Sequence, residues 1–204
     1  MSLFIPPDYF RELLPAEIFP HPCPDGAAAA RPLEVELGCG DGTFLVAMAA
    51  EHRDRDFLGV ERMLGRVSKT SRKIDRAGLN NAKVMRLESA YTVAWLLPGA
   101  SVTRLHLLCP DPWPKKKHAA RRLVNQKEFL DGLARILKPG GEFLLKTDDR
   151  VYFEDALASF ATRAEFAQQD WPEDAFFYPV TDFESHWLES GRTIHRARWR
   201  LVAA

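Results

Sequence analysis

A glycine-rich turn supplies the first residues that point to chemistry, and residues 36–42 read ELGCGDG. Its glycines are spaced GxGxG, whereas a turn that cradles a dinucleotide pyrophosphate at a helix N-terminus reads GxGxxG. The Glu36 carboxylate would repel a pyrophosphate but attract the ammonium and sulfonium groups of S-adenosylmethionine. The pattern favours an S-adenosylmethionine site that includes Glu36, Gly38 and Gly40. A tight turn that binds nothing is the alternative.

Two further acids end the next two strand-like stretches. Glu61 follows the glycine turn at the spacing of about 20 residues where an acid typically accepts hydrogen bonds from ribose hydroxyls. Glu88 stands where a methyltransferase usually contacts the adenine, although a solvated acid at a strand end is the alternative. Three acids at three successive strand ends therefore predict one nucleoside-binding edge.

A proline-rich loop follows the fourth strand-like stretch, and residues 109–122 read CPDPWPKKKHAARR. Its prolines fix φ and remove backbone donors, which predicts a stiff platform that holds a base against a methyl donor. Trp113 either stacks on a base or anchors the loop. Residues 115–127 hold six Lys and Arg and no acid, which predicts a phosphate-binding patch, with a solvated face as the alternative.

Alternating strands and helices must position these groups. The apolar pattern predicts strands over residues 33–37, 57–60, 82–87, 102–108, 142–146 and 194–202. It predicts helices over residues 43–52, 63–77, 90–97, 126–137 and 151–161. Such alternation predicts an α/β fold with a parallel sheet covered on both faces and a site beyond the carboxyl ends of the strands.

The helix over residues 63–77 carries a second basic surface. Its basic side chains recur at helical spacing on one face, namely Arg62, Arg66, Lys69, Lys73 and Arg76. Met63, Val67 and Ile74 fall on another face, which should pack on the sheet. The basic face either follows an RNA backbone or is a plain surface helix.

Composition sets the outer limits. The 204 residues fit one domain over residues 32–204, preceded by an irregular, proline-rich lead-in over residues 1–31. Because Lys+Arg and Asp+Glu are 28 each, only a local patch could indicate a nucleic-acid partner. Three scattered cysteines argue against a zinc site or a disulfide framework and favour a reducing, cytoplasmic compartment. We expect no metal, no membrane span and no signal peptide.

The loop motif and a later segment resemble the bacterial tRNA (guanine-N7)-methyltransferases, the TrmB family. That family has a PDPW segment followed by Lys, His and paired Arg, and a T-x-[FY]-E segment with a downstream glycine. Here these are residues 110–122, residues 181–184 and Gly191. The resemblance runs from Glu34 to about Trp199. It implies a Rossmann-like class I methyltransferase fold, with a mostly parallel seven-stranded sheet.

The resemblance also implies roles for individual residues. Cofactor contacts fall on Glu36, Glu61, Glu88 and Asp111. Substrate contacts fall on Lys115, Arg121, Arg122, Asp148, Thr181, Asp182, Phe183 and Glu184. Two positions depart from the family, which more often has Asp at Glu88 and an aromatic residue or Asn at Asp149. Residues 181–184 could instead form an ordinary connecting turn, and Lys115 could simply be solvated.

Methylation of guanine N7 needs no general base, because N7 attacks with an in-plane lone pair. Asp111 is the predicted catalytic residue, since a fixed carboxylate would favour the positive charge that moves from sulfur to the purine. Asp148 is predicted to accept from guanine N1–H and the amino group. His118 is assigned a phosphate or structural role, and Cys39 and Cys109 are expected to fill space.

The resemblance implies tRNA as the partner, with guanine 46 of the variable loop as the target, and a monomer or a homodimer. Three other functions remain open. An amino-methylating enzyme has a similar Asp-Pro-Pro-aromatic loop, but here Pro110 precedes Asp111 and a lysine run follows Trp113. A catalytically silent RNA-binding module would not need the acids. An NAD-dependent oxidoreductase fits the glycine spacing poorly.

Overall fold

A seven-stranded sheet organises the chain in a computed structural model that describes residues 12–20 and 31–202. The strands are β1 (Leu33–Leu37), β2 (Asp56–Glu61), β3 (Ala82–Arg86), β4 (Val102–Leu108), β5 (Leu137–Thr147), β6 (Phe166–Gln169) and β7 (His195–Leu201). Their order is β3-β2-β1-β4-β5-β7-β6, and β7 runs antiparallel to both of its neighbours. The predicted mostly parallel α/β sheet is confirmed.

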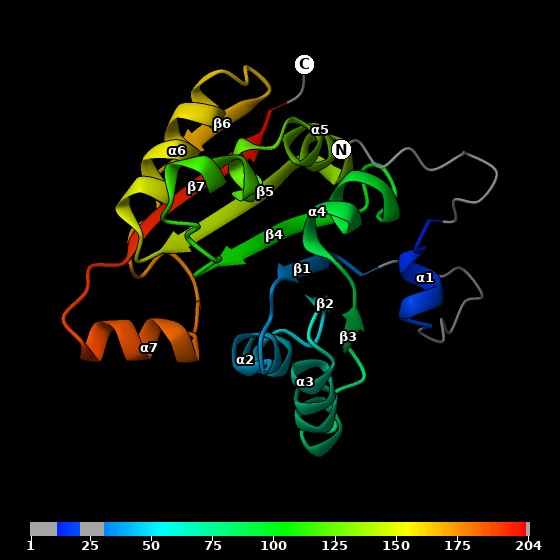
Figure 1. Cartoon of the computed structure of the whole chain (residues 1–204). Helices are drawn as coiled ribbons and strands as arrows, with labels where there is room; N and C mark the ends of the chain where they lie inside the picture. The colour runs from blue at the N-terminus through cyan, green and yellow to red at the C-terminus, as the bar shows by residue number, and fades with distance from the viewer. Residues whose placement is uncertain (1–11, 21–30, 203–204) are drawn as a thin grey trace.

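Helices cover both faces of this sheet (Figure 1). The α-helices are α1 (Pro15–Ile18), α2 (Thr43–Glu51), α3 (Leu64–Arg76), α4 (Ser89–Tyr91), α5 (Lys127–Ile136), α6 (Arg150–Ala161) and α7 (Asp182–Glu189). Short helical turns of other types are η2 (Thr92–Leu96), η3 (Lys116–Arg121) and η4 (Leu123–Asn125). Helices α2 and α3 lie on one face, and α4, α5 and α6 lie on the other.

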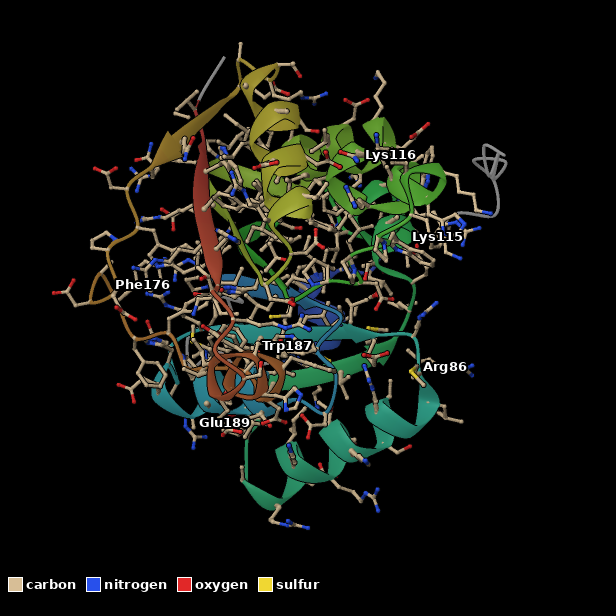
Figure 2. All side chains as sticks on the ribbon, turned by 60° about the vertical axis from the view of Figure 1, so that its left-hand side comes forward. Arg86, Lys115, Lys116, Phe176, Trp187 and Glu189 are labelled. Carbon is tan, nitrogen blue, oxygen red and sulfur yellow. The ribbon has the colours of Figure 1, made fainter. Side chains whose placement is uncertain are left out.

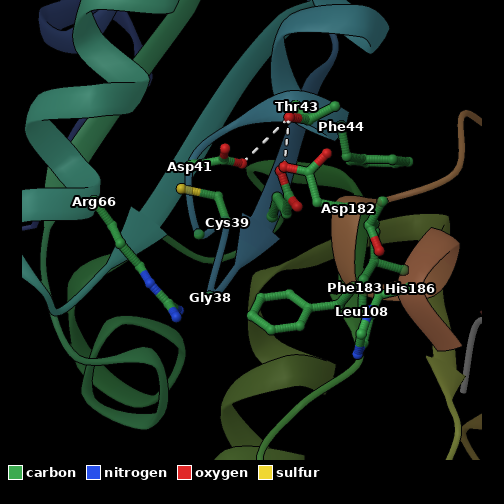
Figure 3. A pocket seen from close by; sticks show the side chains of 13 residues that line it. Gly38, Cys39, Asp41, Thr43, Phe44, Arg66, Leu108, Asp182, Phe183 and His186 are labelled. Carbon is green, nitrogen blue, oxygen red and sulfur yellow. Dashed lines mark hydrogen bonds between the residues drawn. The ribbon is translucent and has the colours of Figure 1, made fainter.

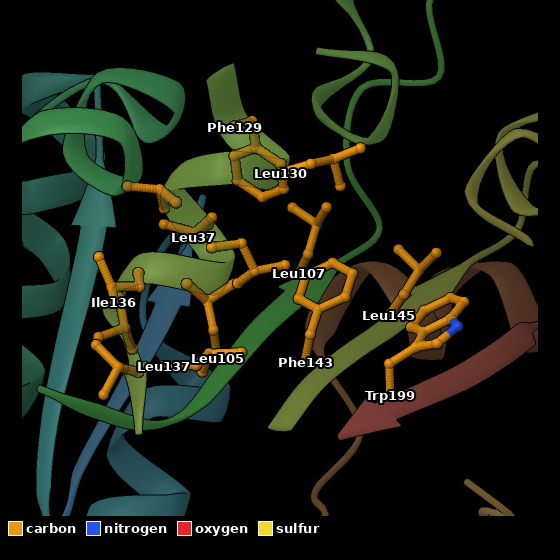
Figure 4. Close-up of a cluster of buried hydrophobic side chains, with 14 of the residues drawn as sticks. Leu37, Leu105, Leu107, Phe129, Leu130, Ile136, Leu137, Phe143, Leu145 and Trp199 are labelled. Atoms are coloured by element: carbon orange, nitrogen blue, oxygen red, sulfur yellow. The ribbon is translucent and has the colours of Figure 1, made fainter. Parts of the chain in front are cut away.

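Alternate residues of the central strands build the larger core under α5 and α6. Leu105, Leu107, Phe143, Leu145 and Trp199 point to this face, as period-two alternation in a strand requires (Figure 4). Aromatic stacking continues outward, because the Phe160 ring lies 4.2 Å from Trp199 and 5.2 Å from Phe143 between ring centroids. This burial fixes the register of the strands whose ends carry the predicted site.

The opposite face is polar where β1 meets β4. His106 Nε2 lies 2.8 Å from Glu34 Oε2, and its Nδ1 lies 2.8 Å from the Tyr178 hydroxyl oxygen. Burial lowers the pKa of His106 and raises that of Tyr178, so a neutral imidazole donates to Glu34 and accepts from Tyr178. Burial opposes ionisation of Glu34, but the hydrogen bonds from His106 and Arg55 and the charge of Arg104 outweigh it and lower its pKa to about 2.

Residues 171–178, a segment with several aromatic side chains, cover this polar face in place of a long helix. The Phe176 ring lies 4.5 Å from the Arg104 guanidinium and 5.4 Å from that of Arg198. Trp171 meets Tyr178 edge-to-face at 4.9 Å between ring centroids. The segment therefore carries the chain from β6 across the charged strand faces to the start of α7.

Four local features differ from expectation. Strand β6 and helix α7 were not predicted, and the one-turn helix α1 lies within the expected irregular lead-in. Strand β5 begins at Leu137 rather than at residue 142, and its register with β4 shifts between Val102 and Arg104. Cys23 and residues 1–11 lie outside the described residues. No helix within the two described stretches is long and apolar enough to cross a membrane.

Candidate active site

A cavity of about 310 Å³ opens where the strand order reverses between β1 and β4. Its walls come from the glycine turn, the start of α2, α3, the end of β4 and α7. The lining residues are Glu36, Gly38, Cys39, Gly40, Asp41, Thr43, Phe44, Arg66, Leu108, Thr181, Asp182, Phe183 and His186. Figure 3 shows Arg66 and Phe183 reaching toward this space from α3 and α7.

The glycine turn needs its glycines for backbone conformation. Gly38, Gly40 and Gly42 have φ of 69°, 58° and 80°, where a Cβ is strained. A Cβ built on Gly38 or Gly40 would meet no atom within 4 Å, so the backbone at both positions is open to the cavity. A Cβ on Gly42 would instead lie 2.4 Å from Thr70 Cγ2, so Gly42 is required by the packing of α2 against α3.

Glu36 is a buried carboxyl group without a full set of partners. Its side chain is almost inaccessible, with the residue 4% exposed, and Oε2 has no hydrogen-bond partner. Burial and the nearby charges of Asp41 and Glu61 raise its pKa well above 4.5, while the Leu45 N–H opposes that rise. Such a group is ready to receive a cationic ligand, whose charge would favour the ionised form.

Two of the other predicted cofactor acids, Glu61 and Glu88, bind backbone amides. Glu61 Oε2 accepts from the Gly40 N–H at 3.1 Å, and Oε1 accepts from the Met63 N–H at 2.8 Å. Glu88 caps α4 by accepting from the Ala90 and Tyr91 N–H groups. Neither residue is among those that line the cavity. Glu61 therefore braces the glycine turn, and the ribose and adenine contacts stay predictions.

Asp111 lies on the exposed loop after β4. Its side chain is 73% exposed, and Oδ2 lies 3.7 Å from Arg62 Nη2, which follows directly after β2. Leu108, at the end of the same strand, lines the cavity. The loop therefore leads from a residue that lines the cavity to an exposed carboxylate beside Arg62, the residue that follows Glu61.

The basic stretch after Asp111 divides into an inner and an outer part. Arg122 is only 4% exposed, and it donates to the Pro112 and Trp113 carbonyls and to Asp155 Oδ2. Its three nitrogens are thus engaged inside the protein, which differs from the predicted substrate contact. We assign Arg122 to holding the proline-rich loop, whose carbonyls need donors.

Arg121 and Lys115 belong to the outer part. The Arg121 guanidinium lies 4.8 Å from the centre of the Trp113 ring, and His118 meets the same ring edge-to-face. Trp113 is half-buried against these residues of its own loop. Lys115 and Lys116 lie to one side of α7 in Figure 2, whereas Phe176 lies to the other. Lys115 and Arg121 stay predicted phosphate contacts.

Helix α7 brings the second motif onto the cavity. Thr181 caps the helix by accepting from the Glu184 N–H at 3.0 Å. Asp182 Oδ2 accepts from the Thr43 hydroxyl at 2.9 Å, so α7 is tied to the helix that follows the glycine turn. The hydrogen-bonded neighbour Asp41 and burial raise the pKa of Asp182. Phe183 is exposed, with the Arg66 guanidinium 5.5 Å from its ring centre.

Glu184 and Asp148 each hold one cation. Lys146 Nζ donates to Glu184 Oε1 at 2.7 Å, and Arg192 Nη1 donates to Asp148 Oδ2 at 2.6 Å. Arg192 also lies 3.8 Å from the centre of the Trp187 ring. Asp148, which follows β5, and the segment over residues 181–184 at the start of α7 therefore lie close together, as one substrate-binding edge would require.

Sequence reasoning missed several residues of the cavity. Asp41, Thr43, Phe44, Arg66 and His186 line it without having been predicted as site residues. Asp41 and Thr43 had a usable signal, because they complete the glycine turn and begin α2. His186 was missed because α7 itself was not predicted. Lys73 joins the same cluster by donating to Asp41 and Thr43 at 2.9 and 2.8 Å.

Comparison with known sequences gives consistent matches. A family model described as "Putative methyltransferase" matches residues 30–197. A protein of Halorhodospira halophila named tRNA (guanine-N(7)-)-methyltransferase is 39% identical over 84% of this chain and 76% of its own length. Proteins of the same name from Syntrophotalea carbinolica and Streptococcus suis are 33% and 34% identical, over 80% and 81% of this chain and 72% and 79% of their own lengths.

Solved structures resemble the whole fold at low sequence identity. The aminoglycoside resistance methyltransferase NpmB1 aligns with a TM-score of 0.61 at 21% identity, covering 86% of this chain and 89% of its own. The 16S rRNA methyltransferase KamB aligns with a TM-score of 0.62 at 17% identity, covering 85% and 89%. At such identities the likeness shows the fold alone.

Proposed function

This chain belongs to the tRNA (guanine-N(7)-)-methyltransferase family, and on that premise we propose that it transfers a methyl group from S-adenosylmethionine to N7 of a guanine in tRNA. The family resemblance predicted from the two motifs is confirmed. We further propose that the target is guanine 46 of the variable loop and that the protein acts in the cytoplasm. Substrate, cofactor and reaction follow from the names of the relatives and from the chemistry of the cavity.

The observation that carries the proposal is the fit between the cavity and a cationic nucleoside cofactor. Glu36 lines the cavity with a buried carboxyl group whose Oε2 has no hydrogen-bond partner, and the glycine turn is open at Gly38 and Gly40. When bound, S-adenosylmethionine supplies a methyl group on a positively charged sulfur. Glu36 would then balance that charge, and the open backbone at the turn would approach the ligand closely.

Protein groups at the proline-rich loop, beyond β5 and on α7 then orient the base. We assign Asp111 to stabilise positive charge as it passes to the purine. Asp148 and Glu184 offer carboxylate acceptors for guanine, because guanine carries donors at N1 and the 2-amino group. Thr181, Asp182 and Phe183 complete this edge from α7, while Lys115 and Arg121 meet the phosphate backbone.

Incubation of unmodified tRNA with labelled S-adenosylmethionine, followed by nucleoside mass spectrometry, tests the proposal. We expect 7-methylguanosine at a single guanine of the variable loop. Another methylated nucleoside would keep the cofactor and overturn the base assignment. No methylation in the presence of measurable cofactor binding would contradict tRNA as the substrate.

The basic face of α3 makes a separate prediction about tRNA affinity. Because Arg66 lines the cavity, we choose the exposed residues Lys69 and Arg76 for charge reversal. Lys69→Glu with Arg76→Glu should weaken tRNA binding and reduce the slope of log affinity against log salt by about one for each phosphate that is no longer neutralised. Filter binding across salt concentrations measures this, with cofactor affinity unchanged.

Lys83→Glu is the matched control, since Lys83 is exposed near the amino end of β3, away from the carboxyl ends where the cavity opens. It changes the net charge by the same amount per substitution but should leave the salt slope at the wild-type value. An unchanged slope in the α3 variant as well would remove this helix from the RNA-binding surface.

A further inference from the structure

Lys146 is a buried cation that the proposed contacts with cofactor and tRNA do not use. It lies on β5 next to the strand's last residue, is 8% exposed, and donates from Nζ to Glu184 Oε1 across 2.7 Å. Glu184 itself is 5% exposed. A buried ion pair loses solvation on both charges and is often no more stabilising than apolar packing. Its place beside the cavity therefore calls for a functional explanation.

The pair leaves one carboxylate oxygen without a partner. Lys146 holds Oε1, whereas Glu184 Oε2 is buried and accepts no hydrogen bond. Buried acceptors are nearly always satisfied, so an unpaired oxygen beside a binding site marks a place for a ligand donor. Residues on both sides of Glu184 along α7, Phe183 and His186, line the cavity.

The other titratable groups around Glu184 are either neutral at working pH or already paired. Burial raises the pKa of Cys109, which follows β4, to about 12, and it raises that of Tyr178, which precedes α7, well above 10.0. Asp148, beyond β5, is paired with Arg192. Lys146 is held in place by aromatic rings, with Nζ 5.0 Å from the Tyr178 ring centre and 5.9 Å from that of Trp171.

We propose that Lys146 is a positioning residue that holds Glu184 by its Oε1, supplies the positive charge beside it, and leaves its Oε2 free to accept from N1–H and the 2-amino group of the target guanine. This inference rests on the proposed function. Adenine has an acceptor at N1 and no 2-amino group, so a fixed carboxylate at this place favours guanine. Lys146 thereby contributes to base selection without touching the base.

The pH profile of kcat/KM for tRNA distinguishes this role from a purely structural one. In Lys146→Met the cation beside the proposed acceptor is gone, so the acidic limb of the profile should move upward by about one pH unit or more. At neutral pH, kcat/KM should fall by about tenfold or more, as for loss of a charged hydrogen bond. Lys138→Met, at the other end of β5, should leave the profile at its wild-type position.

A double-substitution cycle keeps the test valid if Lys146→Met does not fold. Glu184→Gln, alone or combined with Lys146→Met, removes the buried carboxylate. Neither variant therefore holds an unpaired negative charge. If Lys146 acts through Glu184, these two variants should agree in kcat/KM within about twofold, and both should lack the acidic limb. Thermal melting and S-adenosylmethionine titration establish that each is folded.

Two results would overturn the inference. One is a Lys146→Met enzyme whose acidic limb and kcat/KM match the wild type. The other is a combined variant at least about tenfold less active than Glu184→Gln, because Lys146 would then act independently of Glu184. Failure of wild-type protein to form 7-methylguanosine would instead contradict the proposed function, so the two failures are distinguishable.

Discussion

Glu36→Gln is expected to lower the affinity for S-adenosylmethionine by about 10- to 100-fold, the range for a lost hydrogen bond to a charged group. Glutamine keeps the shape of the side chain and removes the charge that would face the ammonium or the sulfonium. Isothermal titration calorimetry gives the affinity directly. Comparison with S-adenosylhomocysteine locates the interaction, because that product keeps the ammonium and has lost the sulfonium charge.

The same carboxyl group should make cofactor binding depend on pH. Because burial, Asp41 and Glu61 raise the pKa of Glu36 in the free protein, a cationic ligand must displace a proton over part of the pH range. Wild-type affinity should therefore rise with pH, up to about tenfold per unit, until Glu36 is ionised. In Glu36→Gln this dependence should be absent. Equal pH slopes in the two proteins would show that another group controls binding.

Stability provides the control for this variant. The folded protein holds the Glu36 proton more tightly than the unfolded chain, whose ordinary value is 4.5. The free energy of unfolding therefore falls as pH rises from 4.5 through the raised pKa of the folded state. Glutamine removes that cost, so Glu36→Gln should melt no lower than the wild type at neutral pH. A lower melting temperature would assign the lost affinity to damage of the fold.

The site residues that could be predicted from sequence are those that lie at or just beyond the carboxyl ends of strands. The apolar pattern located β1 and β4, and the rule that ligands bind beyond the carboxyl ends of parallel strands placed the glycine turn and the proline-rich loop at the same edge of the sheet. Glu36 could be predicted as part of the site because it lies next to the last residue of an apolar strand, just before the glycine turn. The bonds that Glu61 makes to the Gly40 and Met63 amides could not, since they depend on how the turn folds back.

Helix α7 was not predicted, although the sequence contains a local signal for its start. Thr181 and Glu184 have the T-x-x-E spacing of a capping box, which signals a helix start. The Glu184 side chain does not return to the Thr181 backbone but pairs with Lys146, 38 residues away in sequence. The buried position of Arg122 could not be predicted either. A basic run suggests a solvated surface, whereas this side chain turns inward and donates to the carbonyls of its own loop.

Asp111→Asn is expected to reduce kcat by on the order of 100-fold, comparable to loss of one group that stabilises developing charge in a transition state. Asparagine keeps the size of the side chain and removes only its charge. The fold should be unaffected, because the aspartate is 73% exposed and its pairing with Arg62 across 3.7 Å contributes little to stability. Single-turnover methylation of tRNA measures the chemical step apart from product release.

Arg62→Gln separates a catalytic role of Asp111 from a role in that surface pair. If Asp111 stabilises charge on the purine, Arg62→Gln should change the single-turnover rate by no more than about threefold, since an exposed ion pair contributes less than about 1 kcal/mol. A rate loss in Arg62→Gln equal to that in Asp111→Asn would mean that the pair merely orders the loop. A near-normal rate in Asp111→Asn would exclude the carboxylate from the reaction, leaving alignment by the stiff proline-rich loop as the main contribution of this segment.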